Sequence, residues 1–408
     1  MKYVIILGDG MSDEPIKELG GKTPLAYAKT PALDLLSKKS RLGMAKTIPA
    51  GMSPGSDTAN LSVLGFDPRK YYSGRSPLEA LSIGAPMKDG DIAVRLNLVT
   101  VSEQNLGYSE QVIIDHSAGE ITTEEADILL KAAKEGLAAY LKESGFCLYT
   151  GTSYRHCLIW EKGKVLGFTA PHDVLGDRIG PHLPSDPVFR KVMEQSFTIL
   201  KNHPLNILRK QNGKNPANSF WFWGAGTKPN LPIFADKTGK KAIMVSAVDL
   251  LKGIGAASGM KIANVPGANG TLHTNYAGKV EAASNALLND GYDFAYIHIE
   301  APDEMSHQGD LNNKIKAIEY LDEKVIAPVF RRLSESGEDF RLLIMPDHPT
   351  PLKLRTHTAD SVPFLIYDSN VIYDTSVTIP GRSYNEADCQ ASGDFIEAGH
   401  TLINEFLK

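Results

Sequence analysis

Three short apolar runs, each followed at once by acidic or imidazole side chains, stand out along the chain. They are residues 3–7, 294–299 and 340–345. A run that is apolar at nearly every position is typical of a central strand in a parallel sheet, because such a strand is buried on both faces. We therefore expect three central strands whose carboxyl ends carry polar side chains.

Amphipathic helices are predicted between and around these runs. Residues 30–40 begin with Thr30 at the N-cap and Pro31 at the first helical position. Residues 311–333 place apolar side chains on one stripe at helical spacing. Strands that alternate with helices predict an α/β fold, in which an open sheet has helices on both faces. Ligands of such sheets collect beyond the carboxyl ends of the strands.

Residues 73–230 differ in composition from the rest and are richer in Gly, Pro, His and isolated polar residues. Short alternating segments and one long helix over residues 121–145, with a threonine cap at its start, predict a separate layer of structure there. We interpret this stretch as a smaller α/β domain inserted into a core formed by residues 1–72 and 231–408.

Composition and charge restrict the class of protein. The 408 residues are 42% apolar and 22% charged, as in an ordinary globular protein, and the formal net charge is −5. This balance argues against nucleic acid as the main partner. The three scattered cysteines argue against a disulfide framework or a CxxC metal site. Because the first apolar run is too short for a signal peptide or a membrane span, we expect a cytoplasmic protein without a membrane partner. The oligomeric state is not predicted.

The polar residues after the last two runs have the types and the spacing of metal ligands. Asp303 and His307 are four residues apart, so they share one face if a helix begins after the strand. Asp347 and His348 follow the third run, and a short loop would return His357 to them. Taken singly, each motif has a simpler interpretation, as a helix acid beside an incidental histidine or as a turn.

Asp9 and Ser56 complete the candidate site. Asp9 follows the first run and is either a ligand or the N-cap of the next helix. Ser56 lies in the loop GMSPGSDTAN, just before a helical pattern, and such a loop suits an anion at a helix N-terminus. A metal lowers the pKa of a bound oxygen, so it would make this hydroxyl a nucleophile at neutral pH. The simpler alternative is a serine that only caps the helix.

Together these residues suit two divalent ions about 3.5–4 Å apart, which hold the attacking and leaving oxygens of a phosphoryl transfer. One ion is expected at Asp303, His307 and His357. The other is expected at Asp9, Ser56, Asp347 and His348. Three imidazoles in the set favour Mn²⁺ or Zn²⁺ over Mg²⁺ or Ca²⁺.

In this order the residues resemble the alkaline phosphatase superfamily and, within it, the cofactor-independent phosphoglycerate mutases, most nearly their archaeal-type branch. The resemblance covers essentially the whole chain. It includes GDGMSDEP, GMSPGSDTANLSVLGFDP, PLEALSIGAP, SAGEI, YRH, APHD and the aspartate and histidine ligand set. It implies an alkaline-phosphatase-like core around the open sheet, with the inserted domain attached.

The resemblance also implies a reaction on a small phosphorylated substrate. 3-Phosphoglycerate and 2-phosphoglycerate would be interconverted without 2,3-bisphosphoglycerate: Ser56 would accept the phosphoryl group and return it to the 2-hydroxyl after the glycerate reorients. Two divalent ions, with Mn²⁺ expected first and Zn²⁺ or Mg²⁺ as alternatives, would stabilise the charge. The inserted domain would close over the site and keep water from the phosphoserine.

Four residues of the inserted domain are expected to contact the substrate. Arg155 in SYRH has a guanidinium suited to bidentate binding of carboxylate or phosphate. His116, His172 and Asp173 stand in motifs similar to those that line the mutase cleft. A surface position for the arginine and packing or capping roles for the other three are the alternatives.

One departure from the family pattern concerns the substrate. The branch tends to carry an arginine just before Gly-Ala-Gly, where this chain has Trp223 in FWFWGAG. Loss of an arginine would weaken an anion contact; alternatively, Trp221 and Trp223 pack between the domains. A phosphotransferase acting on homoserine, proposed for a tryptophan-bearing bacterial branch, and a metal-dependent phosphomonoesterase stay open. A non-catalytic metal-binding protein is disfavoured, because a scaffold does not need a nucleophile beside the ligand set.

Overall fold

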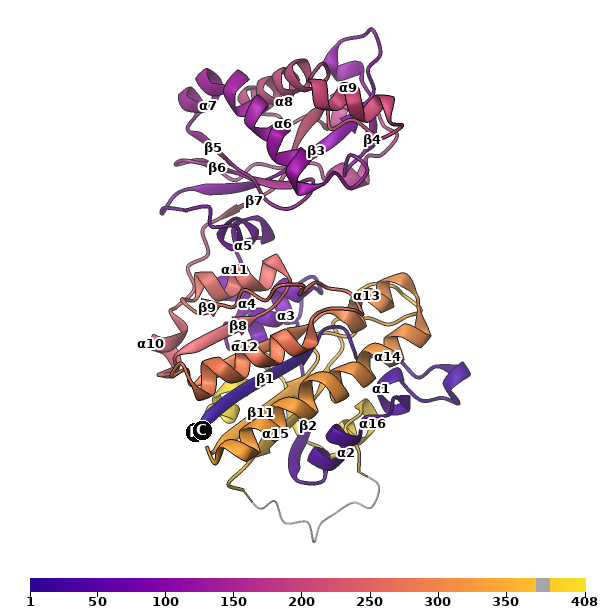
Figure 1. Ribbon diagram of the computed structural model, residues 1–408, viewed down its shortest axis with the longest axis vertical. Coiled ribbons are helices and arrows are strands. Elements are labelled where there is room, and N and C mark those ends of the chain that lie inside the picture. The colour runs from indigo at the N-terminus through magenta and orange to yellow at the C-terminus, as the bar shows by residue number, and fades with distance from the viewer. Residues whose placement is uncertain (372–381) are drawn as a thin grey trace. The chain divides into compact units, whose positions relative to one another are not determined.

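The computed structural model describes residues 1–371 and 382–408 and divides into two compact units (Figure 1). Unit 1 comprises Met1–Tyr72 and Asn230–Lys408, and unit 2 comprises Ser73–Pro229. Each unit has its own sheet.

Among its described residues, unit 1 contains an eight-stranded sheet in the order β13-β2-β12-β11-β1-β10-β8-β9. The central strands β8, β10, β1 and β11 are parallel, and β12 runs antiparallel to both of its neighbours. This confirms the predicted α/β class. The strands are β1 (Lys2–Gly8), β2 (Ser40–Ala45), β8 (Ala242–Val245), β9 (Lys261–Ile262), β10 (Phe294–Ile299), β11 (Phe340–Met345), β12 (Val362–Asp368) and β13 (Phe395–Ile396).

The three apolar runs form the neighbouring strands β1, β10 and β11. Leu7 of β1 pairs with His298 of β10 and with Met345 of β11, so the three carboxyl ends lie level at one edge of the sheet. The backbone that leaves this edge carries Asp9 after β1 and Asp347 after β11.

Helices cover both faces of this sheet (Figure 1). Val4 and Ile6 belong to a buried cluster with residues of α12, α14 and α15, whereas the ring of Tyr3 lies 5.6 Å from that of Phe406 in α17 on the other face. The helices of unit 1 are α1 (Pro24–Tyr27), α2 (Pro31–Ser37), α3 (Ser56–Val63), α4 (Pro68–Tyr71), α10 (Phe234–Thr238), α11 (Asp249–Ala257), α12 (Tyr276–Leu288), α13 (Ala301–Gln308), α14 (Leu311–Leu321), α15 (Ala327–Ser336), α16 (Glu386–Ala391) and α17 (Leu402–Leu407).

Two helices begin or continue differently from the sequence prediction. The single helix expected over residues 311–333 is interrupted between α14 and α15 by a π-helical turn at Asp322–Ile326. Thr30 precedes α2, but its side chain accepts no capping hydrogen bond. The carboxylate of Asp322 accepts hydrogen bonds from the first turn of α2 instead, so the π-turn supplies the cap from a distant part of the chain.

Unit 2 is a five-stranded antiparallel sheet with helices packed against it. The predicted helix over residues 121–145 forms, with Thr122 as its cap, but it breaks at Leu137 into α6 and α7. The elements are β3 (Ile92–Val101), β4 (Ile113–Asp115), β5 (Phe146–Tyr149), β6 (Arg155–Trp160), β7 (Ser219–Thr227), α5 (Arg75–Ser82), α6 (Thr123–Gly136), α7 (Ala138–Ser144), α8 (Pro187–Leu200) and α9 (Pro204–Gln211).

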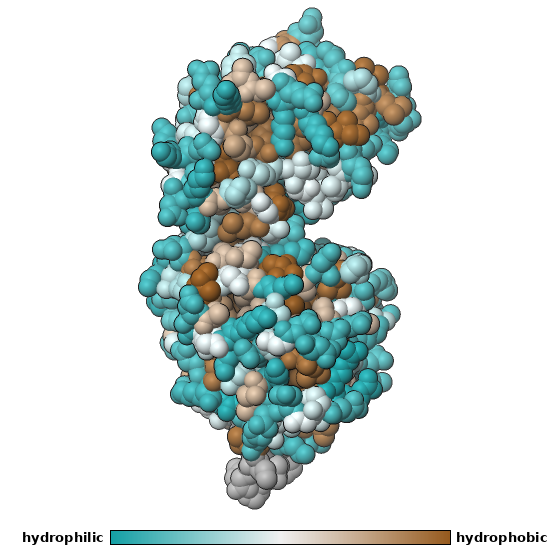
Figure 2. All heavy atoms as spheres, turned by 60° about the vertical axis from the view of Figure 1, so that its left-hand side comes forward, coloured by the Kyte–Doolittle hydropathy of each residue, from teal (hydrophilic) through white to brown (hydrophobic). Residues whose placement is uncertain are grey.

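The surface carries mixed side chains. Figure 2 shows hydrophilic residues over most of the visible face, with apolar residues scattered between them. Among the described residues, none of the helices combines the length and the apolar character that crossing a bilayer requires.

Candidate functional site

Ser56 is the first residue of α3, directly after Gly55, as the sequence predicted. Its backbone therefore lies at the helix end where free N–H groups favour an anion. Its hydroxyl oxygen lies 3.1 Å from Nε2 of His348. The serine is only partly buried, so its hydroxyl can be reached from solvent.

Three buried ligand-type side chains are linked to this serine through His348 and form, with it, the deep group: Ser56, Asp9, Asp347 and His348. Nε2 of His348 lies 3.6 Å from Oδ1 of Asp9 and 3.4 Å from Oδ2 of Asp347. Asp9 is 2% exposed, and Asp347 and His348 are 0% exposed. Residues predicted to share one ion thus lie together.

The other three predicted ligands form the outer group: Asp303, His307 and His357. Asp303 and His307 stand one turn apart on α13, which begins directly after β10, and Oδ2 of Asp303 lies 3.1 Å from Nε2 of His307. Nε2 of His357 lies 3.5 Å from Oδ1 of Asp303 and 3.1 Å from Nε2 of His307. The side chains of His307 and His357 are 36% and 23% exposed, so this group is open to water.

His348 stands between the two groups. Its ring centroid is 4.1 Å from that of His357, and its Nδ1 lies 3.2 Å from the hydroxyl of Thr350, which donates to Asp303. By mutual distance, the ligand atoms of Asp303, His348 and His357 also lie within 4.8 Å of one another. A second set that meets this distance contains Asp9, Asp347 and the unpredicted His298.

Burial dominates the electrostatics of the deep group. Burial raises the pKa of Asp9 well above its usual range, and repulsion from Asp347 raises it further. Burial lowers the pKa of His348, and it lowers the pKa of His298 to about 3. Both imidazoles are therefore neutral at pH 7, as a metal ligand must be.

The outer group behaves differently, because its charges compensate one another. Burial acts to raise the pKa of Asp303, but hydrogen bonds with His307 and His357 outweigh it and hold this pKa well below its usual range. The hydrogen bond to Asp303 raises the pKa of His307 to about 9. At pH 7 His307 therefore carries a proton that an ion would have to displace.

Three buried residues at this site were not predicted. His298 lies 3.0 Å from Asp9, inside the apolar run of β10. Asn60 of α3 donates from Nδ2 to the carbonyl oxygen of Ser56 and to Asp347, both at 2.8 Å, and its Oδ1 accepts from the hydroxyl of Tyr296. The available signal was the Tyr-x-His spacing in FAYIHI, which puts two polar groups on one face of an otherwise apolar strand.

The donor set fits divalent cations. It combines carboxylate oxygens and neutral imidazoles, which suit Mn²⁺ and Zn²⁺ better than the oxygen-only shells typical of Ca²⁺. Among the described residues, Oδ1 of Asp9 is buried and has no hydrogen-bond partner. Such an atom is costly unless it binds a ligand, so its position supports cation binding by the deep group.

In unit 2 the predicted substrate-binding residues lie near one another. The ring of His116 lies 6.2 Å from that of His172 and 5.8 Å from that of Tyr154, over which Arg155 stacks at 5.2 Å. Asp173 is next to His172 and largely exposed. Within residues 1–371 and 382–408, no hydrogen bond or ion pair engages the guanidinium of Arg155, so it is available to an anion.

Trp223, where the resemblance to the archaeal-type branch led us to expect an arginine, lies beside these residues. Its ring is 5.2 Å from that of His172, and its Nε1 donates to Asn97. The guanidinium of Arg95 stacks over it at 4.0 Å and is held by Glu79. Trp221 is buried in the core of unit 2, so the alternative that it packs between the domains is wrong.

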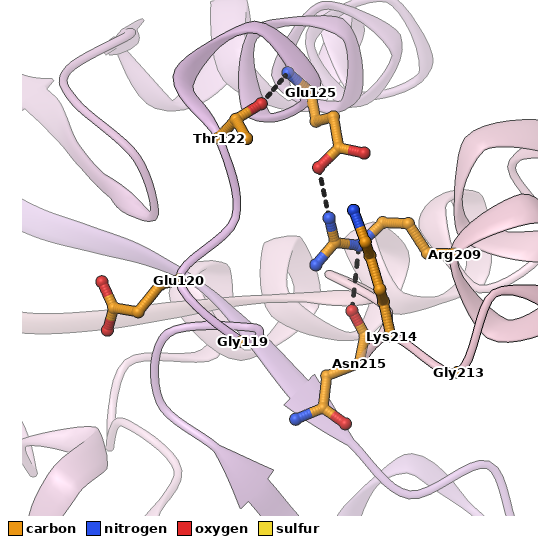
Figure 3. A pocket seen from close by; sticks show the side chains of 8 residues that line it. All are labelled: Gly119, Glu120, Thr122, Glu125, Arg209, Gly213, Lys214 and Asn215. Carbon is orange, nitrogen blue, oxygen red and sulfur yellow. Dashed lines mark hydrogen bonds and ion pairs between the residues drawn. The ribbon is translucent and has the colours of Figure 1, made fainter.

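A cavity of about 310 Å³ also lies in unit 2 (Figure 3). Its one buried cation, Arg209, donates to Glu125 and to the carbonyl oxygens of Ala118 and Asn215. All three nitrogens of this guanidinium therefore have partners, and its charge is paired with that of Glu125, whereas no such partner engages Arg155 among the described residues.

Comparisons with known proteins show what the chain is similar to. Residues 37–206 match the family model described as 2,3-bisphosphoglycerate-independent phosphoglycerate mutase. A protein of that name from Methanothrix thermoacetophila is 45% identical over 99% of this chain and 98% of its own length. A probable one from Geobacter sulfurreducens is 43% identical over the full length of both.

Solved structures give the same result. A protein from Pyrococcus horikoshii matches with a TM-score of 0.80 and 29% identity, covering 100% of this chain and 96% of that one. A cofactor-independent phosphoglycerate mutase from Thermoplasma acidophilum matches with a TM-score of 0.67 and 26% identity, covering 100% and 99%. Similarity of this extent over the whole chain places it in the family of 2,3-bisphosphoglycerate-independent phosphoglycerate mutases.

Proposed function

We propose that the chain interconverts 3-phosphoglycerate and 2-phosphoglycerate through a phosphoserine at Ser56, without 2,3-bisphosphoglycerate. The observation that supports this most directly is the hydroxyl of Ser56 at the start of α3, 3.1 Å from His348 and beside two buried carboxylates. The full-length similarity to proteins named for this reaction supports it independently.

The chain's own residues supply the nucleophile and its setting. The Ser56 oxygen attacks phosphorus, the bond from phosphorus to the 3-oxygen of glycerate breaks, and that oxygen takes up the proton that the serine loses. After glycerate reorients, its 2-hydroxyl attacks the phosphoserine, and Ser56 regains a proton. The N-terminus of α3 favours the negative charge of the phosphoryl group throughout.

Ions at the two groups would stabilise negative charge on the Ser56 oxygen and on the transferring group. Asp9, Asp347 and His348 would hold one ion together with Ser56, and the outer group would hold the other. We propose Mn²⁺ as the metal, with Zn²⁺ and Mg²⁺ as alternatives.

Arg155, with His116, His172 and Asp173, would bind the carboxylate and hydroxyl groups of glycerate. The unengaged guanidinium of Arg155 supports this role. Closure of the inserted domain over the intermediate and a cytoplasmic location stay predictions from the sequence.

Replacing Arg155 tests the substrate contact. Arg155→Gln should raise KM for 3-phosphoglycerate about tenfold or more, because one charge-assisted hydrogen bond is lost. Arg178→Gln is the matched control, since Arg178 is an exposed arginine of the same unit that already pairs with Glu110. Equal KM values for the two variants would remove Arg155 from the substrate site.

The reaction itself is tested by a coupled assay of 3-phosphoglycerate conversion with added Mn²⁺, with and without 2,3-bisphosphoglycerate. Conversion that requires Mn²⁺ and ignores the bisphosphate is expected. Release of inorganic phosphate in place of 2-phosphoglycerate would establish the phosphomonoesterase instead. Inactivity on 3-phosphoglycerate with transfer to homoserine would make Trp223 the determinant of a different substrate.

A further inference from the structure

His298 connects two elements of the sheet edge at the deep group. It is the penultimate residue of β10, and its side chain is completely buried. Its Nε2 lies 3.0 Å from Oδ2 of Asp9 after β1, and its Nδ1 lies 3.3 Å from the hydroxyl of Ser246 after β8. Both ring nitrogens therefore have polar partners, although the surrounding strand is apolar.

The partners fix the direction of the two hydrogen bonds. The hydroxyl oxygen of Ser246 accepts from the backbone N–H of Val248 at 3.0 Å, so its own proton is free to be donated to Nδ1 of His298. A carboxylate that binds an ion is ionised and only accepts, so with the ion bound Nε2 of the neutral His298 carries the hydrogen and donates it to Asp9. The chain of donors runs from Ser246 through His298 to Asp9.

This chain leaves one oxygen of Asp9 for the ligand cluster. Oδ2 is occupied by His298, whereas Oδ1 is buried, has no hydrogen-bond partner among the described residues, and lies 3.6 Å from Nε2 of His348. A hydrogen bond to one carboxylate oxygen fixes the plane of the group and thereby aims the other, which is the usual part of a partner behind a metal ligand.

We propose that His298 is the positioning residue of Asp9, which it orients for ion binding as part of the donor chain from Ser246, and that it is not itself an ion ligand. One of its ring nitrogens lies within 4.8 Å of carboxylate oxygens of Asp9 and Asp347, so distance alone would suggest a ligand. The hydrogen that it donates to Asp9 occupies the position a ligand's lone pair would need. This inference rests on the proposed two-ion site and specifies how that site is held.

The test is Mn²⁺ binding measured by calorimetry on the full chain. His298→Met removes the donor while keeping an unbranched apolar side chain of similar length. This variant should bind Mn²⁺ at the deep group about ten to a hundred times more weakly than the parent. The outer ion should keep its affinity within about twofold. His298→Gln places an amide N–H near the position of Nε2 and should recover most of the loss.

Controls separate positioning from a general effect of altering a buried histidine. His156 is a buried histidine of unit 2, and His156→Gln should leave both affinities unchanged. Ser246→Ala removes only the far end of the chain and should weaken the deep ion by less than His298→Met does. Ser258→Ala is its matched control, since Ser258 is a buried serine of unit 1 whose hydroxyl donates within α11. Should His298→Met fail to fold, the two serine variants carry the test.

Three results would overturn the inference. Equal ion affinities in His298→Met and the parent would show that Asp9 needs no orientation from this residue. Loss of one whole ion from both His298→Met and His298→Gln would make His298 a direct ligand. No ion uptake by the folded parent protein would overturn the proposed site itself and the inference with it.

Discussion

The deep group and the outer group contain the same types of ligand residue but differ in how the negative charge of their carboxylates is compensated. In the deep group two buried carboxylates, Asp9 and Asp347, face neutral imidazoles, and among the described residues no lysine or arginine forms an ion pair with either carboxylate. In the outer group Asp303 pairs with His307, and this contact raises the pKa of His307 to about 9.

This difference indicates the charge state of each group before an ion binds. Hydrogen bonds from His298 and Asn60 orient the two buried carboxylates of the deep group, and no cation neutralises them among the described residues, so the group is organised for a cation in advance. The outer group is half open to solvent and already balanced by a proton. An ion at the deep group relieves the repulsion between Asp9 and Asp347, whereas an ion at the outer group must displace the proton of His307.

The largest expected effect is the loss of turnover when the nucleophile, Ser56, is replaced while the residues of the ligand groups are kept. Ser56→Ala should lower turnover by at least ~10³-fold, because the covalent step is lost. Folding and the outer ion should persist. Ser53→Ala, in the same loop and exposed, is the control and should be nearly as active as the parent. Mutase turnover of Ser56→Ala near the parent rate would contradict a phosphoserine pathway.

Replacing a carboxylate by an amide should change the stability of the ion-free protein in opposite directions in the two groups. A chelator removes the ions before the measurement. Asp9→Asn removes a charge that burial and Asp347 disfavour, so the ion-free protein should gain about 1 kcal/mol of stability. Asp303→Asn removes a charge that His307 and His357 favour, so stability should fall by a similar amount. Urea midpoints measure both, and shifts of the same sign would abolish the distinction.

A further effect is a pH dependence that arises from His307 of the outer group. The pKa of His307 is raised in the folded protein, to about 9 from about 6.5 unfolded, so its contribution to ion-free stability is complete below pH 6.5. It is lost as pH rises towards 9. In His307→Gln the urea midpoint should therefore change less with pH between about 6.5 and 9 than it does in the parent. An unchanged slope in that variant would mean that another group titrates there.

Much of the fold could be predicted, because each apolar run specifies a strand by itself. The predictions of β1, β10 and β11, and of a helix beginning at Ser56, are confirmed. The break at Leu137 and the π-turn at Asp322–Ile326 were missed, since helical spacing of apolar residues continues across both. Tertiary contacts determine where such interruptions occur, and the spacing of apolar residues along the sequence gives no information about these contacts.

The candidate site was predictable where polar residues follow a strand and not where they lie inside one. The structure brings Asp9, Asp347 and His348 together with Ser56, although their roles as ion ligands stay a prediction. His298 was missed because an imidazole within an apolar run is most often a satisfied core residue. Only the register of β10 against β1 shows that it faces Asp9.

The central claim is that the deep group prepares Ser56 for phosphoryl transfer. The most direct measurement is mass spectrometry of the Mn²⁺-loaded protein, mixed with 3-phosphoglycerate, quenched within the first turnovers and digested. The account predicts one phosphoryl group, on the peptide that contains Ser56, present in the parent and absent from Ser56→Ala. Active conversion with that peptide unmodified, or with the phosphoryl group on another residue, would contradict it.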